Sequence, residues 1–171
     1  GYNAYGQLGE SSTSNRSTIT QVTSLTSGVT SVAAGTYHSC AVHNGQAKCW
    51  GYNANGQLGN NTTSTAATAT AQQVSGLTSG VSFVSAGVLS SCALLTSGSV
   101  MCWGYNQYGQ LGNGTSSQST VPVQVSGLTS GVTSLSVGNQ HACAVQYGAA
   151  YCWGQNGNYQ LGDGTNTTRY A

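Results

Sequence analysis

The hydrophobic residues of this chain fall into short runs that return about every fifty residues. The first three runs are VTSVAA (29–34), SCAVH (39–43) and AKCWG (47–51), each with a glycine at or near its end. Short apolar runs closed by turn residues are typical of β-strands. No segment keeps the 3.6-residue period of an amphipathic helix, so we expect almost no helix.

Sequence motifs repeat with the same period. GQLG, or YQLG in its last occurrence, begins at residues 6, 56, 109 and 159, so successive steps are 50, 53 and 50 residues. A period near fifty built from short strands is the signature of a β-propeller, in which each repeat forms one blade. We therefore predict an all-β fold of propeller blades with four antiparallel strands, at positions that we call a, b, c and d in chain order.

The repeats divide the chain into about three blades. Residues 29–80 are expected to form blade 1, residues 81–131 blade 2, and residues 132–171 a blade 3 that lacks its d strand. Residues 1–28 are expected to form a c–d loop and an orphan d strand at 18–24, without a, b or c strands of their own. Because propellers contain about four to eight blades, we expect the chain to belong to a larger ring or a strand-sharing assembly.

Three arrangements fit this blade count. The chain is a fragment of a longer seven-bladed propeller, or two chains form one closed ring, or each chain donates its orphan d strand to the open blade of the next. Donation covers an exposed strand edge with backbone hydrogen bonds, and repeated head to tail it gives a ring or a filament. The donated residues are Thr18, Ile19, Thr20, Gln21 and Val22.

Each predicted b–c hairpin carries two cysteines. Asn44-Gly45 is a strong signal for a two-residue type I′ turn, because both positions need positive φ. Around this turn Cys40 faces Cys49 in a non-hydrogen-bonded pair. The Cα atoms of such a pair lie about 4.5 Å apart, which is within the range that a disulfide spans.

The same count applies to the other two repeats. Cys143 faces Cys152 around a turn of equal length, and Cys92 faces Cys102 around Thr96-Ser97-Gly98, which is one residue longer. We therefore predict one disulfide per blade, with buried free thiols as the alternative; the absence of a CxxC motif argues against zinc. Disulfides form in oxidising compartments, so we expect a secreted or cell-surface protein.

Charge is nearly absent from the chain. Three basic and two acidic residues make 3% of the sequence, against about 25% in an average protein. Nucleic-acid binding and a basic membrane-surface helix both require clustered Lys and Arg residues, which this chain lacks. No apolar run approaches the roughly 20 residues of a membrane span. We therefore expect neither nucleic-acid binding nor membrane insertion.

Few residues are available for catalysis. Glu10 and Asp163 are the only acids, both lie in predicted loops, and we find no counterpart of either in the other repeats. Paired-carboxylate chemistry and a Ser-His-Asp triad therefore lack their acids. His38 and His141 hold matching positions and are interpreted as hydrogen-bonding residues of the blades instead of metal ligands. We predict no enzymatic activity and no cofactor.

The aromatic residues divide into two groups. One Trp follows the second cysteine of each repeat, and we expect all three to be core residues. Tyrosines lie in the c–d loops, which share one rim of the propeller. The candidate binding residues there are Tyr5, Tyr52, Tyr105, Tyr108 and Tyr159. Loops rich in Tyr and Asn suit adaptable recognition of an extracellular protein or a glycan, although a purely structural role is the alternative.

The c–d loops also contain all the N-glycosylation sequons, N-x-[ST]. They begin at Asn15, Asn60, Asn61, Asn113 and Asn166. Attached sugars would solubilise a chain that has almost no charge. Loops made of Asn, Ser and Thr also produce sequons by composition alone, so glycosylation is a hypothesis.

One stretch carries a family resemblance. WGYNANGQLG (50–59), with AGTYH (34–38) before it and PVQV (122–125) in the next repeat, resembles the repeat of the regulator of chromosome condensation family. The resemblance covers essentially the whole chain, is greatest to secreted bacterial members with a cysteine pair per blade, and implies a seven-bladed propeller. The family's nucleotide-exchange and chromatin-binding activities use charged loops and basic tails, which this chain lacks.

Two functional hypotheses result. The first is an extracellular structural or interaction protein, a disulfide-stapled propeller repeat array that associates with identical chains by d-strand donation. The second is a secreted binding module or protein inhibitor that uses the propeller loop face.

Overall fold

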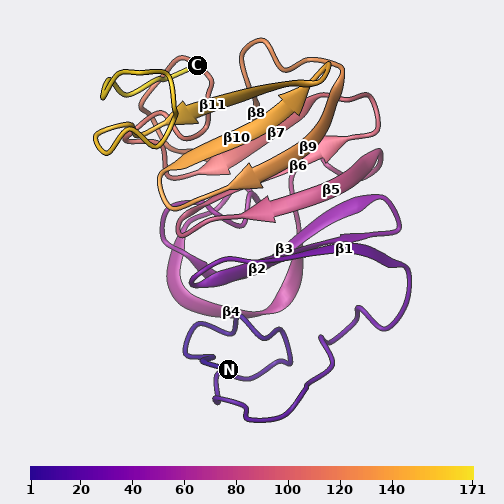
Figure 1. Cartoon of the computed structure of the whole chain (residues 1–171). Helices are drawn as coiled ribbons and strands as arrows, with labels where there is room; N and C mark the ends of the chain where they lie inside the picture. The colour runs from indigo at the N-terminus through magenta and orange to yellow at the C-terminus, as the bar shows by residue number, and fades with distance from the viewer.

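Eleven β-strands and no helix make up the computed structural model, which describes residues 1–171. The strands form three antiparallel sheets stacked in chain order, with the N-terminal segment at one end of the stack and the C-terminus at the other (Figure 1). The predicted all-β fold of propeller blades is confirmed.

Each sheet is one blade, and neighbouring strands in the sheet are neighbours in the chain. Blade 1 contains β1 (Val29–Ala34), β2 (His38–His43), β3 (Gln46–Asn53) and β4 (Ser64–Gln73). Blade 2 contains β5 (Val81–Ala86), β6 (Ser90–Leu95), β7 (Val100–Gly104) and β8 (Ser119–Gln124). Blade 3 has three strands, β9 (Val132–Val137), β10 (His141–Gln146) and β11 (Ala149–Gly154).

The b–c hairpins have the predicted turns and register. Asn44 and Gly45 have φ values of 51° and 75°, and Cys40 lies directly opposite Cys49. In the three-residue turn of blade 2, Gly98 has a φ of 81°. Each hairpin is closed by a disulfide with a Cα–Cα distance of 4.1 Å, joining Cys40 to Cys49, Cys92 to Cys102, and Cys143 to Cys152.

The d strand of blade 1, β4, begins at Ser64, inside a tract of small and polar residues that carries no clear strand pattern in the sequence. Threonine is β-branched and fits a pleated strand, so the Thr- and Ala-rich tract pairs with β3. The register shifts twice along this pair, and such bulges accommodate the additional residues.

Residues 18–24 do not form the predicted d strand. No c strand lies beside them to supply a hydrogen-bonding ladder, and Ile19 is fully exposed. The segment nevertheless holds a d position. Thr23 N–H donates to the carbonyl oxygen of Gly9 at 2.8 Å, as Ser75 N–H donates to Gly59 at 2.8 Å after the d strand of blade 1.

The tryptophans are core residues, as predicted. All three are buried, and the indole N–H of each donates to the carbonyl oxygen of a glutamine in the preceding c–d loop. These bonds join Trp50 to Gln7, Trp103 to Gln57, and Trp153 to Gln110, at 2.9, 2.9 and 3.0 Å. Each c–d loop therefore covers the core of the next blade.

Candidate functional site

The rim of c–d loops is built on one buried asparagine per loop. In blade 1, Asn53 Oδ1 accepts the backbone N–H of Leu58 at 3.0 Å, and Asn53 Nδ2 donates to the Thr62 carbonyl at 3.0 Å. The four equivalent residues are Asn3, Asn53, Asn106 and Asn156. These buried amides are hydrogen-bonded, and the same bonds give the four loops a common conformation. Sequence analysis missed them, although the spacing N-x-x-x-Q-L recurs in every repeat.

A second polar position closes each loop. Asn60 Oδ1 accepts the N–H of Thr62 at 3.3 Å and its hydroxyl at 2.7 Å. Asn113 makes the same two bonds to Thr115. The corresponding residues of the four loops are Glu10, Asn60, Asn113 and Asp163. Two of the predicted sequon asparagines therefore act as acceptors that hold the loop.

The two acids are counterparts of each other, so our expectation that neither is echoed was wrong. Glu10 accepts from Arg16 Nε at 2.8 Å, and Asp163 accepts from Arg169 Nε at 2.9 Å. Hydrogen bonds from the Thr165 hydroxyl and from Arg169 lower the pKa of Asp163, and those from Arg16 and Ser12 lower the pKa of Glu10. Both acids are loop-closing groups.

The remaining sequon asparagines have different surroundings. Asn15 Oδ1 accepts the backbone N–H of Asn3 at 2.8 Å. Asn61 is exposed, has a φ of 63°, and its Oδ1 accepts the Thr120 hydroxyl at 3.4 Å. Asn166 is exposed and its side chain makes no hydrogen bond to the protein.

The structure brings some of the candidate rim tyrosines together. The ring centroids of Tyr5 and Tyr52 lie 4.7 Å apart, and Tyr37 joins them at 5.5 and 6.1 Å. Tyr2 packs edge-on against Tyr5 at 6.3 Å. Sequence analysis did not include Tyr37 because it lies in the a–b loop, which reaches the same rim.

The other candidate tyrosines stand apart from this group. Tyr105 and Tyr108 form a separate edge-to-face pair at 6.5 Å. Tyr159 is exposed, has a φ of 60°, and contacts no other aromatic ring.

A second candidate site is the outer edge of β11, where blade 3 has no d strand. In blade 1 the c-strand residue Ala47 exchanges two backbone bonds with the d segment, accepting from Val74 and donating to Leu77, each at 3.0 Å. Ala150 holds the same position in β11, and only an isolated bridge between Gly154 and Arg169 lies on that side of the strand. Ala150 is exposed, whereas Ala47 is fully buried.

The segment at 18–25 carries an incomplete version of the complementary contacts. In blade 1, Gln73 Nε2 donates to the carbonyl oxygens of Val74, Leu77 and the c-strand residue Ala47, at 3.0 to 3.1 Å. Gln21 Nε2 donates to the first two equivalents, Val22 at 3.4 Å and Leu25 at 3.0 Å. The third acceptor, a c-strand carbonyl, is missing.

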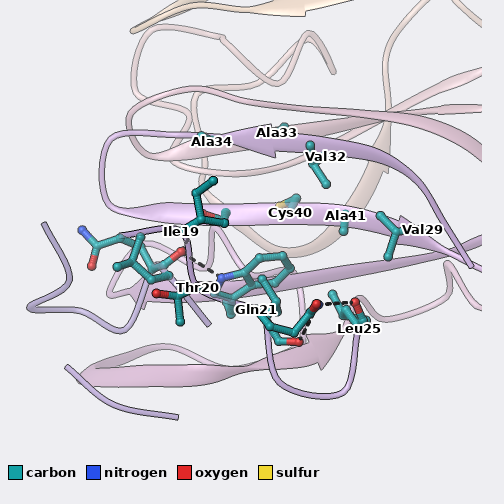
Figure 2. Close-up of a pocket in the computed structure, with 15 residues that line it drawn as sticks. Ile19, Thr20, Gln21, Leu25, Val29, Val32, Ala33, Ala34, Cys40 and Ala41 are labelled. Atoms are coloured by element: carbon teal, nitrogen blue, oxygen red, sulfur yellow. Dashed lines mark hydrogen bonds between the residues drawn. The ribbon is translucent and has the colours of Figure 1, made fainter. Parts of the chain in front are cut away.

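An apolar groove lies between this segment and blade 1. It has a volume of about 610 Å³, and Figure 2 shows strand residues of β1 and β2 facing the segment of Thr20 and Gln21. Val32 of β1 is 71% exposed in the groove, whereas its counterparts Val84 and Leu135 are 1% and 5% exposed. Those counterparts are covered by the preceding blade, so blade 1 presents an uncovered blade-docking face.

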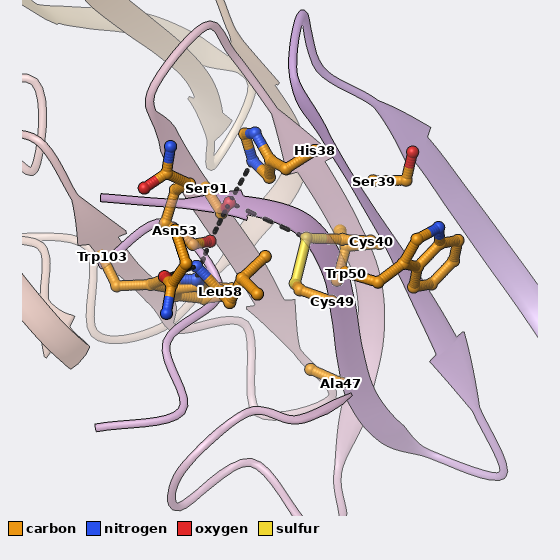
Figure 3. Close-up of a disulfide and its surroundings, with 12 residues drawn as sticks. His38, Ser39, Cys40, Ala47, Cys49, Trp50, Asn53, Leu58, Ser91 and Trp103 are labelled. Atoms are coloured by element: carbon orange, nitrogen blue, oxygen red, sulfur yellow. Dashed lines mark hydrogen bonds between the residues drawn. A yellow bond between two sulfur atoms is a disulfide. The ribbon is translucent and has the colours of Figure 1, made fainter. Parts of the chain in front are cut away.

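The histidines do not form a metal centre. His38 is fully buried and points at Ser91 of blade 2, with 2.8 Å between its Nε2 and the Ser91 Oγ (Figure 3). Ser91 in turn donates to the Gln57 carbonyl at 2.9 Å. Burial lowers the pKa of His38 to about 4. His141 is only half-buried, and no group of three His, Cys, Asp or Glu side chains is placed to hold a metal ion.

These features define a class of protein, a β-propeller repeat array with a hairpin disulfide in each blade. The model of the regulator of chromosome condensation (RCC1) repeat matches residues 1–42 and 97–145, and a second RCC1 repeat model matches 29–57 and 81–110. The chain belongs to this family, as the resemblance implied. The structure has no helix that could cross a membrane.

Solved propellers share the fold. Human WBSCR16 is 25% identical with a TM-score of 0.80, over 97% of this chain and 43% of that one. Yeast RCC1 (Prp20), crystallised bound to Kap60, is 21% identical with a TM-score of 0.73, over 84% and 36%. Prp20p from Saccharomyces cerevisiae is 22% identical with a TM-score of 0.73, over 84% of this chain and 37% of that one. The chain spans less than half the length of these proteins.

Proposed function

We propose that this chain is an extracellular protein-interaction module that associates with further copies of itself through its blades. Residues 18–25 of one copy pair with the open edge of β11 in the next. The observation that carries this proposal is that the segment at 18–25 and the edge of β11 each lack the hydrogen-bond partner that the other could supply. Gln21 lacks one c-strand acceptor, and the c-strand residue Ala150 lacks a d-strand partner.

The contacts of blade 1 are the template for this pairing. By analogy with Ala47, the Ala150 carbonyl accepts from Val22 N–H and from Gln21 Nε2, and Ala150 N–H donates to the Leu25 carbonyl. The same docking seats the disulfide side of blade 3 on the exposed Val32 of blade 1. Within the chain, the disulfides of blades 1 and 2 pack in this way against the following blade.

The pairing requires one loop to move. Residues 1–18 repeat the arrangement of residues 154–171: Arg16 N–H donates to Gly1 and Arg169 N–H donates to Gly154, each at 3.0 Å. In a head-to-tail pair the donor's 1–18 and the acceptor's 154–171 compete for one place. We infer that the donor's loop swings aside, because the backbone bridge between Gly154 and Arg169 already ties the acceptor's loop to β11.

An interaction role also agrees with the relatives. Yeast RCC1 was crystallised bound to Kap60, and Prp20p was studied for binding to Gsp1p and histones. Those partners are not carried over, because this chain has three basic residues in all. The three disulfides support secretion. We propose no catalytic activity.

Two truncations test the proposal by light scattering after size-exclusion chromatography. Deleting residues 1–17 removes the competing loop and retains the donated segment, so it should shift the chain toward larger assemblies. Deleting residues 1–25 removes the donor and should leave monomers. Identical masses for both variants at every concentration would rule out strand donation. Ser116→Ala in the full chain is the control, because Ser116 is exposed in the c–d loop of blade 2, outside the proposed pairing, and its mass should equal that of the wild type.

A further inference from the structure

The cluster of Tyr2, Tyr5, Tyr37 and Tyr52 lies where the first c–d loop meets blade 1. We propose that this cluster is a binding site for a neutral polysaccharide. The inference does not depend on strand donation, because the cluster is complete in a single chain. Donation as proposed above would displace residues 1–18 and with them Tyr2 and Tyr5, so binding is measured on the monomeric chain.

The fold does not require tyrosine at these positions. The repeats share one backbone, so a residue needed for folding should recur in every blade. The counterparts of Tyr5 are Asn55, Tyr108 and Asn158, those of Tyr37 are Leu89 and Gln140, and those of Tyr52 are Tyr2, Tyr105 and Gln155, so each position has at least one counterpart that is not tyrosine. All three positions carry tyrosine at only one junction. The cluster is therefore a local departure from the repeat, and we assign it to recognition.

The chemistry of the cluster fits a ligand with both apolar faces and hydroxyl groups. The rings of Tyr5, Tyr37 and Tyr52 are half-buried, and none of the four hydroxyls hydrogen-bonds to the protein. Tyrosine offers an apolar ring face together with a polar tip. Sugar rings present C–H faces that pack on aromatic rings, and hydroxyls that pair with phenolic oxygens.

The surroundings favour an uncharged ligand. Three charged side chains lie near the cluster along the chain: Glu10, Arg16 and Lys48. Glu10 and Arg16 pair with each other at 2.8 Å, which leaves Lys48, four residues before Tyr52, as the single unpaired charge. Thr36, the residue before Tyr37 of the cluster, lines a shallow hollow of about 320 Å³. Its lining comes from the turns between a and b strands in all three blades and carries backbone amides, Thr36 and Asn139. These groups can bond sugar hydroxyls without contributing charge.

The test uses substitutions that the repeat itself carries. A triple variant, Tyr5→Asn, Tyr37→Leu and Tyr52→Gln, places the residues found at Asn55, Leu89 and Gln155, so its melting temperature should stay close to that of the wild type. The control variant, Tyr105→Gln and Tyr108→Asn, changes the separate tyrosine pair. Binding is measured by native affinity electrophoresis in gels that contain oat β-glucan, galactomannan, amylopectin or hydroxyethylcellulose.

We expect at least one of these four polymers to retard the wild-type chain and the control variant alike. The triple variant should lose about tenfold or more in apparent affinity, as expected when three stacking rings are removed. Absence of retardation in all four gels, equal retardation of the triple variant, or retardation only by an anionic polymer such as heparin would each overturn the proposal.

Discussion

At the scale of single residues, His38 links folding to pH. Burial lowers its pKa from 6.5 to about 4 in the folded chain, so the unfolded chain takes up the proton first as the pH falls. Stability is then fully present above about pH 6.5 and is lost between pH 6.5 and 4. The difference amounts to about 2–3 kcal/mol at pH 4.5.

Urea unfolding at pH 7 and pH 4.5 measures this loss. His38→Gln keeps a donor for Ser91 but cannot take up a proton, so it should flatten the pH dependence. Asn139→Gln is the control, because it changes an exposed residue that does not titrate, and it should keep the wild-type slope. An unchanged slope in His38→Gln would contradict the assignment.

The role of a residue could be predicted from the sequence where the same residue type recurs in every repeat. It was harder to predict where different residue types fill the same role. The three tryptophans were recognised as core from their fixed place after each second cysteine. Glu10, Asn60, Asn113 and Asp163 were not aligned, because three residue types serve one acceptor role. Tyr37 was missed since contact with Tyr5 depends on loops 32 residues apart, which only the fold brings together.

At the scale of elements, the disulfides should stabilise the blades unequally. Each closes a hairpin of about ten residues, which is worth about 2–3 kcal/mol by the loop-entropy estimate. Cys92 and Cys102 are fully buried against blade 3, whereas Cys143 and Cys152 are half-buried at the open side. Replacing the blade 2 pair by alanines therefore also leaves a cavity, which adds a packing cost.

We expect the double variant Cys92→Ala, Cys102→Ala to lose more free energy of unfolding than Cys143→Ala, Cys152→Ala, by about 1 kcal/mol or more. Chemical denaturation of both variants under non-reducing conditions provides the comparison. Equal losses would show that the covalent link alone matters and that the interblade packing of the sulfur atoms contributes nothing.

Hairpins were predictable from the sequence because their turns are local. The number of turn residues sets the strand register, so the opposition of Cys40 and Cys49 follows from counting. The d strands were harder, since they pair across long loops. The polar tract at 64–71 forms a strand because β3 lies beside it and supplies hydrogen-bonding partners. Residues 18–24 form no strand, because no c strand lies beside them. Strand formation there depends on the neighbour.

At the scale of the whole molecule, the stack has two unlike ends. The first blade exposes Val32 and the groove beneath the segment at 18–25, and the last blade exposes the edge of β11. Within the stack the equivalent surfaces cover each other. The period of the sequence predicted the blade count, but it could not show which valines lie uncovered, because Val32 and Val84 hold the same position in the repeat.

Hydrogen–deuterium exchange at β11 tests the pairing of the two ends most directly. The N–H of Ala150 should exchange quickly in dilute protein and slowly in concentrated protein, when the Leu25 carbonyl of a second copy accepts its hydrogen bond. A peptide that covers Ala47 is the internal control, because this N–H already bonds to Leu77 at 3.0 Å and should be protected throughout. The protection of Ala150 should vanish in the chain that lacks residues 1–25. Equal exchange at Ala150 across all concentrations would contradict the account.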